Sequence, residues 1–388
     1  MASVTATLPS TASCVIVGGG VIGASIAFHL AEAGTREVVL IERDQLASGS
    51  TSRAAGGVRA QFSDPLNIQI GQRSLAAFAD FARRPGGEID LKQVGYLFLL
   101  SRDQDVAAFE QNIELQNQLG VPSRLISVDE ARRLSPLVRG DDLLAAAFSA
   151  DDGHCTPEAV VQGYAAAARA LGARIETGCQ LEGVERTADA ITAVATSRGR
   201  VETGCLICAA GAWSAEVGDL AGVPLPVVPL RRQVLHTGPM DGLPDRMPMT
   251  IDFATGFYFH REGPGLLMGM ADPQEQPGFK LDATEDWIPA LMEVVERRAP
   301  GIAEAGIAGG WAGLYEVTPD HNAIIGEASR PSRFLYSTGF SGHGFLQGPA
   351  VGEIIRDLVL GETPFVDVST LSVDRFDDCR LRPEFNIV

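Results

Sequence analysis

Lysine is almost absent from the sequence. Of the 31 basic residues only Lys92 and Lys280 are lysine, so any mechanism that needs a lysine has two candidates. Positive charge is also scarce overall, with 49 acidic residues, a formal charge of −18 and an isoelectric point near 4.7. This field repels nucleic acid and anionic membranes, which excludes both as expected partners. We therefore expect a small-molecule substrate, and an anionic one would need a local cationic pocket.

Cysteine is too sparse for a disulfide framework, with six residues in 388 and no regular spacing. This composition predicts a reducing, cytoplasmic location. Cys205 and Cys208 form a C-x-x-C pair, but no second pair follows, and the stretch "VETGCLICAAGAW" predicts a buried strand. We interpret both as core residues and predict no metal site.

Targeting and membrane signals are missing as well. The stretch "MASVTATLPSTAS" has no basic run of the kind that opens a secretory signal. Residues 14–30 are nearly uncharged and carry Gly19 and Gly23 at small-xxx-small spacing, but a membrane helix of about 20 apolar residues tolerates few glycines at mid-span. A buried strand, a turn and a helix explain the run better, so we expect no membrane span.

A glycine cluster lies between a predicted strand at 13–17 and a predicted helix that begins near Gly23 and ends at Gly34. In the pattern Gly18-x-Gly20-x-x-Gly23 the first glycine permits a tight turn, the second lets a pyrophosphate approach, and the third lets helix and strand pack closely. The start of the helix would then offer N–H groups and a partial positive charge to the phosphates. A second predicted strand, "EVVLIE", ends at Glu42, where a carboxylate accepts hydrogen bonds from a ribose 2′-OH. The pattern predicts FAD or NAD, and not NADP.

The loop that follows distinguishes the two cofactors. Residues 46–62, "LASGSTSRAAGGVRAQF", are rich in small residues, and a flavin needs a long loop to wrap its pyrophosphate and ring. The stretch resembles the flavin loop of the glycine oxidase, sarcosine oxidase and D-amino acid oxidase family. Further matches run from about residue 13 to 376, in the order "DDGHCTPEAVVQGYAAAARALGARI", "CLICAAGAWSAEV", "PLRRQVLHT" and "WAGLYEVTPDHNAIIG".

Near the C-terminus, "GFSGHGF" (residues 339–345) is identical to a flavin motif of the monomeric sarcosine oxidases. A glycine-rich turn that leads into a helix presents backbone N–H groups, which can stabilise negative charge on a reduced flavin. His343 is the ionisable group of this motif. It tunes flavin reduction or oxygen chemistry in one interpretation and only packs locally in the other.

The resemblance implies an α/β fold, in which a discontinuous Rossmann-like FAD-binding domain is joined to an α+β substrate domain with an antiparallel sheet. We assign residues 13–90, 150–220 and 312–388 to the FAD-binding domain, and residues 91–149 and 221–311 to the substrate-binding domain. The predicted sheet strands are 95–100, 231–237, 256–261 and 265–270. The predicted FAD-binding residues are Gly18, Gly20, Val21, Ile22, Gly23, Glu42, Arg43, Ser50, Thr51, Ser52, Arg53, Ala55, Gly56, Gly57, Val184, Ala210, Gly211, Trp213, Gly313, Gly342, His343, Gly344, Phe345 and Leu346.

The activity that the resemblance implies is oxidation of the Cα–N bond of a small amino acid that is secondary or N-substituted, similar to sarcosine, glycine or iminodiacetate. Hydride moves to flavin N5, the imine hydrolyses, and dioxygen or another acceptor takes the electrons. An arginine would hold the carboxylate, because its planar fork pairs with both oxygens. Arg59 is the first candidate, Arg231 and Arg232 are alternatives, and Arg53 is expected to face phosphate or loop backbone. Tyr258 and Tyr315, with His260, are expected to line the pocket, although aromatic core packing explains them equally well.

Three departures from sarcosine oxidase narrow this expectation. Sarcosine oxidases attach the flavin covalently to a cysteine, and this sequence has Gly313 or Leu314 at that position. We therefore expect FAD to be bound noncovalently. In sarcosine oxidases one lysine helps to hold the substrate carboxylate, and this sequence has Leu346 at that position. A second lysine activates dioxygen in those enzymes, and its position falls near Leu267 here. A missing cation beside the flavin slows the reaction with oxygen. The family at large favours an oxidase mildly over a dehydrogenase.

Two other functions stay open. "FSGHG" and "VDVSTLSVDRF" also resemble a mitochondrial flavoprotein of respiratory complex assembly, which suggests a noncatalytic flavoprotein. "GGVRAQFSD" resembles the β subunits of sarcosine and proline dehydrogenases, which suggests one subunit of a hetero-oligomer.

Overall fold

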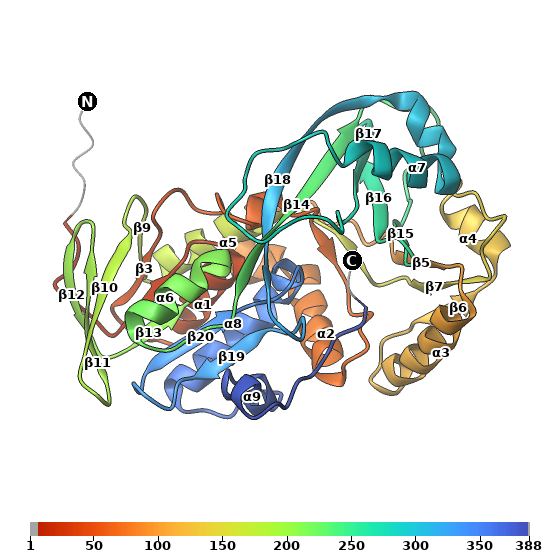
Figure 1. The fold of residues 1–388 in the computed structure, drawn as a ribbon. Helices are drawn as coiled ribbons and strands as arrows, with labels where there is room; N and C mark the ends of the chain where they lie inside the picture. The colour runs from red at the N-terminus through yellow and green to blue at the C-terminus, as the bar shows by residue number, and fades with distance from the viewer. Residues whose placement is uncertain (1–6, 387–388) are drawn as a thin grey trace.

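Two large β-sheets organise the chain, and the computed structural model describes residues 7–386 (Figure 1). The first sheet has six strands in the order β19-β20-β13-β2-β3-β9, of which only the edge strand β19 runs antiparallel to its neighbour. Its strands are β2 (Cys14–Val17), β3 (Val38–Ile41), β9 (Arg174–Glu176), β13 (Leu206–Cys208), β19 (Ile324–Glu327) and β20 (Phe334–Thr338).

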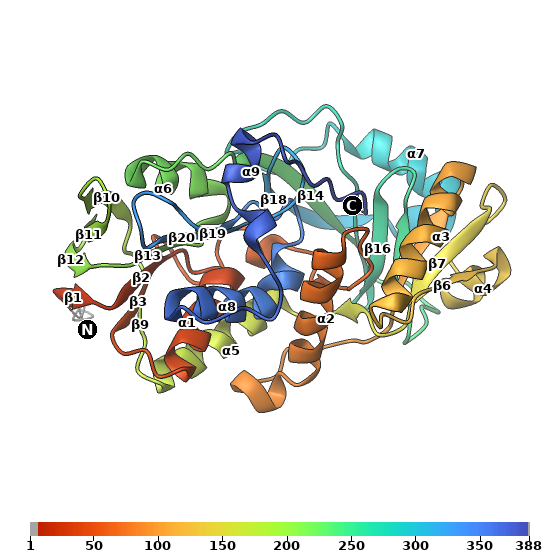
Figure 2. The same ribbon diagram turned by 90° about the horizontal axis from the view of Figure 1, so that it is seen from below.

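Both faces of this sheet are buried. Cys14 and Ile16 pack toward helices on one face, and Val15 and Val17 pack toward a small sheet on the other. This explains why β2 is an unbroken apolar run, as is usual for parallel strands covered on both sides. The helices, grouped in Figure 2, are α1 (Val21–Glu32), α2 (Pro65–Ala79), α5 (Pro157–Ala170) and α8 (Gly344–Leu360). The opposite face carries β1 (Thr11–Ala12), β10 (Leu181–Arg186), β11 (Ile191–Thr196), β12 (Gly199–Thr203) and α6 (Ser214–Ala221).

Glycines on α8 allow α1 and α8 to pack closely. A Cβ at Gly348 would lie 2.8 Å from Val21 Cγ2, and a Cβ at Gly352 would lie 2.1 Å from Ser25 Oγ. The two helices start beyond the ends of β2 and β20, which point the same way in the sheet. Both helix N-termini therefore lie at the carboxyl edge of the strands, where open α/β sheets bind their ligands.

The second sheet has eight strands in the order β18-β14-β17-β16-β15-β5-β7-β6. All neighbours are antiparallel except β5 and β15, which pair in parallel. Its strands are β5 (Tyr96–Leu100), β6 (Arg124–Ile126), β7 (Ala145–Ser149), β14 (Val228–Thr237), β15 (Met249–Asp252), β16 (Phe257–Glu262), β17 (Gly265–Gly269) and β18 (Ile307–Val317). The four strands predicted from the sequence correspond to β5, β14, β16 and β17, which confirms them.

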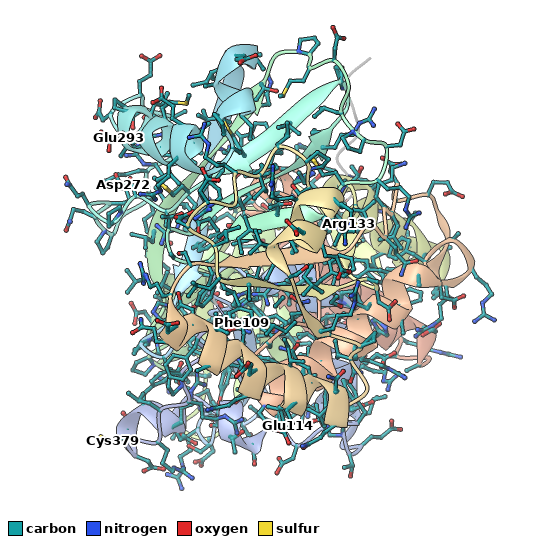
Figure 3. The ribbon with its side chains drawn as sticks, turned by 90° about the vertical axis from the view of Figure 1, so that its right-hand side faces the viewer. Phe109, Glu114, Arg133, Asp272, Glu293 and Cys379 are labelled. Atoms are coloured by element: carbon teal, nitrogen blue, oxygen red, sulfur yellow. The ribbon has the colours of Figure 1, made fainter. Side chains whose placement is uncertain are left out.

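Helices cover part of each face of the second sheet. Phe109 of α3 (Asp103–Gln118) packs on Phe98 of β5, and α3 lies in front in Figure 3, where Phe109 and Glu114 are labelled. The opposite face is covered by α4 (Val128–Leu134) and α7 (Ile288–Arg298), which carry the labelled Arg133 and Glu293. The rest of the first face, along β14, β15, β16 and β18, is left for a ligand.

Short elements complete the description. They are β4 (Gly57–Val58), which pairs with β8 (Gly153–His154), then η1 (Thr51–Arg53), η2 (Ala82–Gly86), η3 (Gly211–Trp213), η4 (Pro300–Ala305), η5 (Ser369–Leu371) and α9 (Asp374–Asp377). The two-domain division stays a prediction, and its boundary at residue 312 falls inside β18. Among residues 7–386 no helix is long and apolar enough to cross a membrane.

Candidate functional site

A cavity of about 600 Å³ extends from the β2–α1 turn to the open face of the eight-stranded sheet. It brings together most residues that the sequence predicted, although they come from segments far apart in the chain. The predicted residues that line it are Gly18, Gly20, Val21, Ile22, Glu42, Arg43, Ser50, Thr51, Arg53, Ala55, Gly56, Gly57, Arg59, Ala210, Gly211, Trp213, Tyr258, Gly313, Tyr315, Gly342, His343, Gly344, Phe345 and Leu346. The predicted residues that lie outside the lining are Gly23, Ser52, Val184, Arg231 and His260.

The β2–α1 turn has the geometry expected of a pyrophosphate-binding turn. Gly18 has φ +114°, and a Cβ there would lie 2.2 Å from the Ala209 carbonyl oxygen. A Cβ at Gly23 would lie 1.9 Å from the Gly18 carbonyl oxygen, so Gly23 acts by allowing close packing and not by contact with a ligand. Gly20 has no side chain that could cap α1, and the first turn carries no acidic residue, while the Val21 N–H donates to Thr51 Oγ1 at 3.2 Å and leaves the other first-turn N–H groups for a ligand. The helix N-terminus is therefore available to an anion.

The next two segments lie where a nucleotide ribose and a flavin loop are expected. One Glu42 carboxylate oxygen accepts a hydrogen bond from the Gly19 N–H at 2.6 Å, which holds the acid at the turn. In the loop, Ser50 Oγ donates to the Leu314 carbonyl at 2.7 Å, and Arg53 Nη1 donates to the Ala312 carbonyl at 2.7 Å. Arg53 thus holds the loop against β18 through a strand carbonyl. The glycine turn, the helix start without an acidic residue and the Glu42 carboxylate together fit a dinucleotide.

Val184 is placed differently from the expectation. It lies within β10, pairs with Val194 and packs against the core beneath the six-stranded sheet. The cavity is lined instead by Cys179, Gln180 and Leu181, where the chain enters β10. The predicted residue, Val184, lies three positions after Leu181 in the chain. The alternation of residues along a strand does not show which end of the strand reaches the edge of the sheet, so the sequence did not identify the lining residue.

At the other end of the cavity the α8 N-terminus faces inward. Gly342 has φ +104°, and a Cβ there would lie 2.5 Å from the Tyr315 ring. His343 is the N-cap residue, and no side chain in the described chain caps this helix. Burial lowers the pKa of His343 well below its ordinary value, and the nearby Arg59 lowers it further. His343 is therefore neutral near pH 7 and supplies no positive charge to the cavity.

Arg59 lines the cavity but is already engaged. Its guanidinium donates to the backbone carbonyls of Gln61 and Asn386, and its Nη2 lies 3.3 Å from His343 Nε2. It also lies over the Phe62 ring, with Cζ 4.2 Å from the ring centroid. Three of its five N–H donors are therefore directed at groups of the protein itself.

Arg232 also lines the cavity, but it makes fewer hydrogen bonds to the protein than Arg59 does. It lines the cavity from β14, with Cζ 5.2 Å from the centroid of the Tyr315 ring. Its Nη1 donates to the Arg231 carbonyl at 3.1 Å, but its buried Nε has no partner among the described residues. The neighbouring Arg231 pairs with Glu275 at 2.6 Å and does not line the cavity.

Apolar and phenolic side chains complete this wall. Met249 and Ile251 of β15 and Tyr96 of β5 line the cavity, although the sequence did not single them out. Burial raises the pKa of Tyr96, Tyr258 and Tyr315, so all three remain protonated phenols at neutral pH. The wall therefore combines apolar surface, O–H groups and one incompletely bonded cation.

Glu316 is a site residue that the sequence did not reveal. It lines the cavity beside the α8 N-terminus, and its Oε2 accepts hydrogen bonds from Thr338 Oγ1 at 2.8 Å and the Gly339 N–H at 3.1 Å. Burial raises its pKa to about 7. This carboxyl group consequently changes charge near neutral pH inside the cavity.

One cluster in the described chain resembles a metal site. Ligand atoms of His154, His260 and Glu262 lie within 4.8 Å of one another. However, His260 Nδ1 lies 2.9 Å from the Arg261 carbonyl oxygen, and its Nε2 lies 3.1 Å from the Ala55 carbonyl oxygen. With both ring nitrogens directed at carbonyl oxygens, His260 has no nitrogen lone pair directed at an open ligand position.

Neither lysine lines the cavity. Lys92 pairs with Asp90 and Lys280 pairs with Glu275, each at 2.7 Å. Leu267 is buried in β17, opposite His260 and His236. The cavity cations are therefore arginines.

Comparisons with known proteins agree on one family. The model described as "FAD dependent oxidoreductase" (DAO) matches residues 13–358. Mouse mitochondrial sarcosine dehydrogenase is 29% identical over 384 residues, which cover 95% of this chain and 42% of that protein. FAD-dependent oxidoreductase domain-containing protein 1 of Xenopus laevis is 30% identical and matches 98% of this chain and 85% of its own length. The crystal structure of L-proline dehydrogenase from P. horikoshii superposes with a TM-score of 0.91, at 32% identity, over 97% of this chain and all of that one.

We predict that Gly18→Ala disrupts the site far more than Gly34→Ala. Both glycines have positive φ, which costs an alanine about 1–2 kcal/mol, but only Gly18 also faces a backbone clash. Nothing lies within 4 Å of a Cβ at Gly34, so that variant isolates the conformational cost. Thermal unfolding and the flavin content of purified protein measure both effects. Equal losses in the two variants would contradict the packing role of Gly18.

We predict a pH-dependent effect of Glu316→Gln on the protein without cofactor. The ordinary glutamate pKa of 4.5 is raised to about 7 in the folded state, so the folded protein binds the proton more tightly than the unfolded chain does. Its stability advantage is complete below about pH 4.5 and is lost as the pH rises through 7, by at most about 1.4 kcal/mol per pH unit. Glutamine cannot ionise, so the variant should gain stability relative to the parent between pH 5 and 8.

Denaturant unfolding at several pH values measures this difference. Glu185→Gln is the control, because that exposed carboxylate pairs with Arg200 and its pKa is lowered, which gives no trend above pH 5. A constant difference between Glu316→Gln and the parent would show that Glu316 is already ionised at pH 5.

Proposed function

The chain belongs to the DAO family of FAD-dependent oxidoreductases, and from that membership we propose that it is a dehydrogenase oxidising the Cα–N bond of a small secondary or N-methylated amino acid. Membership of the family confirms the predicted resemblance, the fold class and FAD as the cofactor. The observation that carries the proposal is the cavity itself, which connects the dinucleotide turn to a wall with an available arginine.

The names of the relatives support this substrate class. Sarcosine dehydrogenase and dimethylglycine dehydrogenase act on N-methylated glycines, and L-proline dehydrogenase acts on a secondary amino acid. The chain spans less than half the length of the two mitochondrial dehydrogenases, 42% and 44%. It spans the whole of the L-proline dehydrogenase chain, which makes that protein the more useful guide to substrate.

The proposal of a dehydrogenase differs from the expectation drawn from the sequence, which favoured an oxidase mildly. The oxidase expectation rested on the family at large, and the glycine oxidase from Geobacillus kaustophilus is 24% identical, a level that speaks for the fold alone. Both lysines of this chain are in ion pairs outside the cavity, and His343 is uncharged. An oxidase gains from a cation that stabilises incipient superoxide, and the cavity arginines are bound to carbonyls or lie on the substrate wall. The oxidase remains the second candidate, since 4-methylaminobutanoate oxidase of Paenarthrobacter nicotinovorans is 27% identical.

Arg232 is proposed to hold the substrate carboxylate in place of Arg59. A carboxylate needs donors that are not already bonded, and the buried Nε of Arg232 has no partner among the described residues, whereas Arg59 holds two backbone carbonyls and contacts His343. Pairing with a carboxylate would satisfy that buried N–H, which otherwise costs about 1–3 kcal/mol.

The other wall residues orient the amine. Tyr258 remains a protonated phenol and can donate a hydrogen bond, while Met249 and Ile251 offer apolar surface to the carbon chain and exclude water. The nearby guanidinium of Arg232 and the low polarity both favour the neutral amine, the form that releases hydride. FAD, when bound, accepts that hydride. No protein base is required by this arrangement.

We predict that the flavin is bleached anaerobically by proline or sarcosine and that air recolours it slowly. An artificial electron acceptor should restore the colour quickly. Stopped-flow absorbance of the flavin band measures both steps, with glycine, iminodiacetate, D-alanine and simple amines as the comparison set. Rapid recolouring by air would favour the oxidase. Absence of bleaching by every amine would contradict the proposal and favour the noncatalytic alternative, and solution mass with copurification tests the hetero-oligomer alternative.

We predict that Arg232→Gln raises the KM for a carboxylate-bearing amine about 30-fold, because losing a charged hydrogen-bond pair costs about 2 kcal/mol. Turnover of the matching amine without a carboxylate should change little. Arg200→Gln is the matched control, since Arg200 pairs with Glu185 and Glu202 on the small sheet, outside the cavity. An unchanged KM in Arg232→Gln, with a raised KM in Arg59→Gln, would return the carboxylate to Arg59.

A further inference from the structure

The loop between β17 and α7, residues 271–286, places apolar side chains where solvent reaches them. Phe279 is 47% exposed and Leu281 is 39% exposed, within a stretch that is rich in polar and charged residues. In Figure 1 the loop leaves the eight-stranded sheet, reaches toward α6 and returns to α7, and Asp272 near its start is labelled at the edge of the molecule in Figure 3. Leu281 lines the cavity, so the loop forms part of its mouth.

The 271–286 loop is held on β14 by hydrogen bonds on both sides of Phe279. The Gly278 N–H donates to the Pro229 carbonyl at 2.9 Å, and the Thr284 N–H donates to Gln233 Oε1 at 2.7 Å. Arg231 adds an ion pair with Glu275 at 2.6 Å, and that carboxylate is only 3% exposed. These contacts hold the loop against the eight-stranded sheet.

The tip of the loop contacts the dinucleotide-binding part of the chain. The Phe279 ring stacks on Trp213, with centroids 5.3 Å apart and planes at 18°. Trp213 also carries the Arg43 guanidinium, whose Cζ lies 3.9 Å from the ring centroid. Arg43 directly follows Glu42, the expected ribose-binding carboxylate, and both Arg43 and Trp213 line the cavity. Three segments distant in sequence thus meet beside the ribose end of the site.

We propose that the 271–286 loop is a clamp that retains the adenosine half of FAD, with Phe279 on Trp213 as its closing contact. The positions expected for covalent flavin attachment hold Gly313 or Leu314, and neither has a nucleophilic side chain, so we expect FAD to be retained by noncovalent contacts. Cofactor exchange at this mouth requires Phe279 to leave Trp213. The clamp acts on cofactor release and leaves the substrate wall, formed by β14, β15 and β16, in place.

The rate of FAD release from the holoprotein tests this clamp without any substrate. Loss of the aromatic stack removes part of the free energy that holds the loop on Trp213. Phe279→Ala should therefore release FAD roughly two- to tenfold faster than the parent. Dilution of the holoprotein, followed by flavin fluorescence, gives the rate, and titration of apoprotein with FAD gives the affinity. Phe279→Tyr keeps the ring and should retain the parental rate.

Phe365→Ala is the matched control, because Phe365 is 42% exposed, contacts Arg73 and lies outside the cavity lining. Its release rate should equal that of the parent, and thermal unfolding of all three apoproteins should agree. A parental release rate in Phe279→Ala would overturn the proposal. A change in KM for the amine, with FAD release unchanged, would assign the loop to the substrate and would also overturn it.

Discussion

The close approach of the β2–α1 turn to the end of β13 is the constraint on which both ends of the site depend. Gly18 lies so near the Ala209 carbonyl that no side chain fits between them, and Gly23 is equally close to Gly18. These contacts place the start of α1 at the edge of the sheet. Gly348 and Gly352 then hold α8 against α1, which brings the α8 N-terminus to the far end of the same cavity. Two helix N-termini are thus positioned by close packing at glycines, where no Cβ would fit.

The attraction of the cavity for an anionic substrate depends on which arginines are already hydrogen-bonded to other groups of the protein. The protein as a whole is strongly acidic, so an anionic substrate meets favourable potential only near individual arginines. Arg53 holds the flavin loop to β18, and Arg59 holds two backbone carbonyls, so both serve the architecture. Arg232 differs from them because its Nε is buried without a described partner. The distinction between structural and recognising arginines follows from hydrogen bonding and not from position in the sequence.

Much of the cofactor half could be predicted from the sequence, because its determinants are local. The glycine turn, Glu42 and the start of α8 each lie within a few consecutive residues that form one strand-turn-helix unit. The substrate half was less accessible. Tyr96 belongs to "YLFLL", which is buried on both faces, so alternation gave no direction for its side chains. Phe279 was missed because its partner, Trp213, lies 66 positions away, and a single sequence does not identify such contacts.

The pairing of β14 with β18 limits how the molecule can move. All ten residues of β14 pair with β18, and near the Val317 end of β18 the Glu316 carbonyl accepts from the Ser341 N–H of the β20–α8 turn at 3.0 Å. Rotation of one sheet away from the other would have to bend or break this two-stranded ribbon. The ribbon therefore links the substrate wall to the flavin loop, because the β18 carbonyls of Ala312 and Leu314 accept hydrogen bonds from Arg53 and Ser50. Adaptation to substrates of different size is left to side chains and loops at the rim.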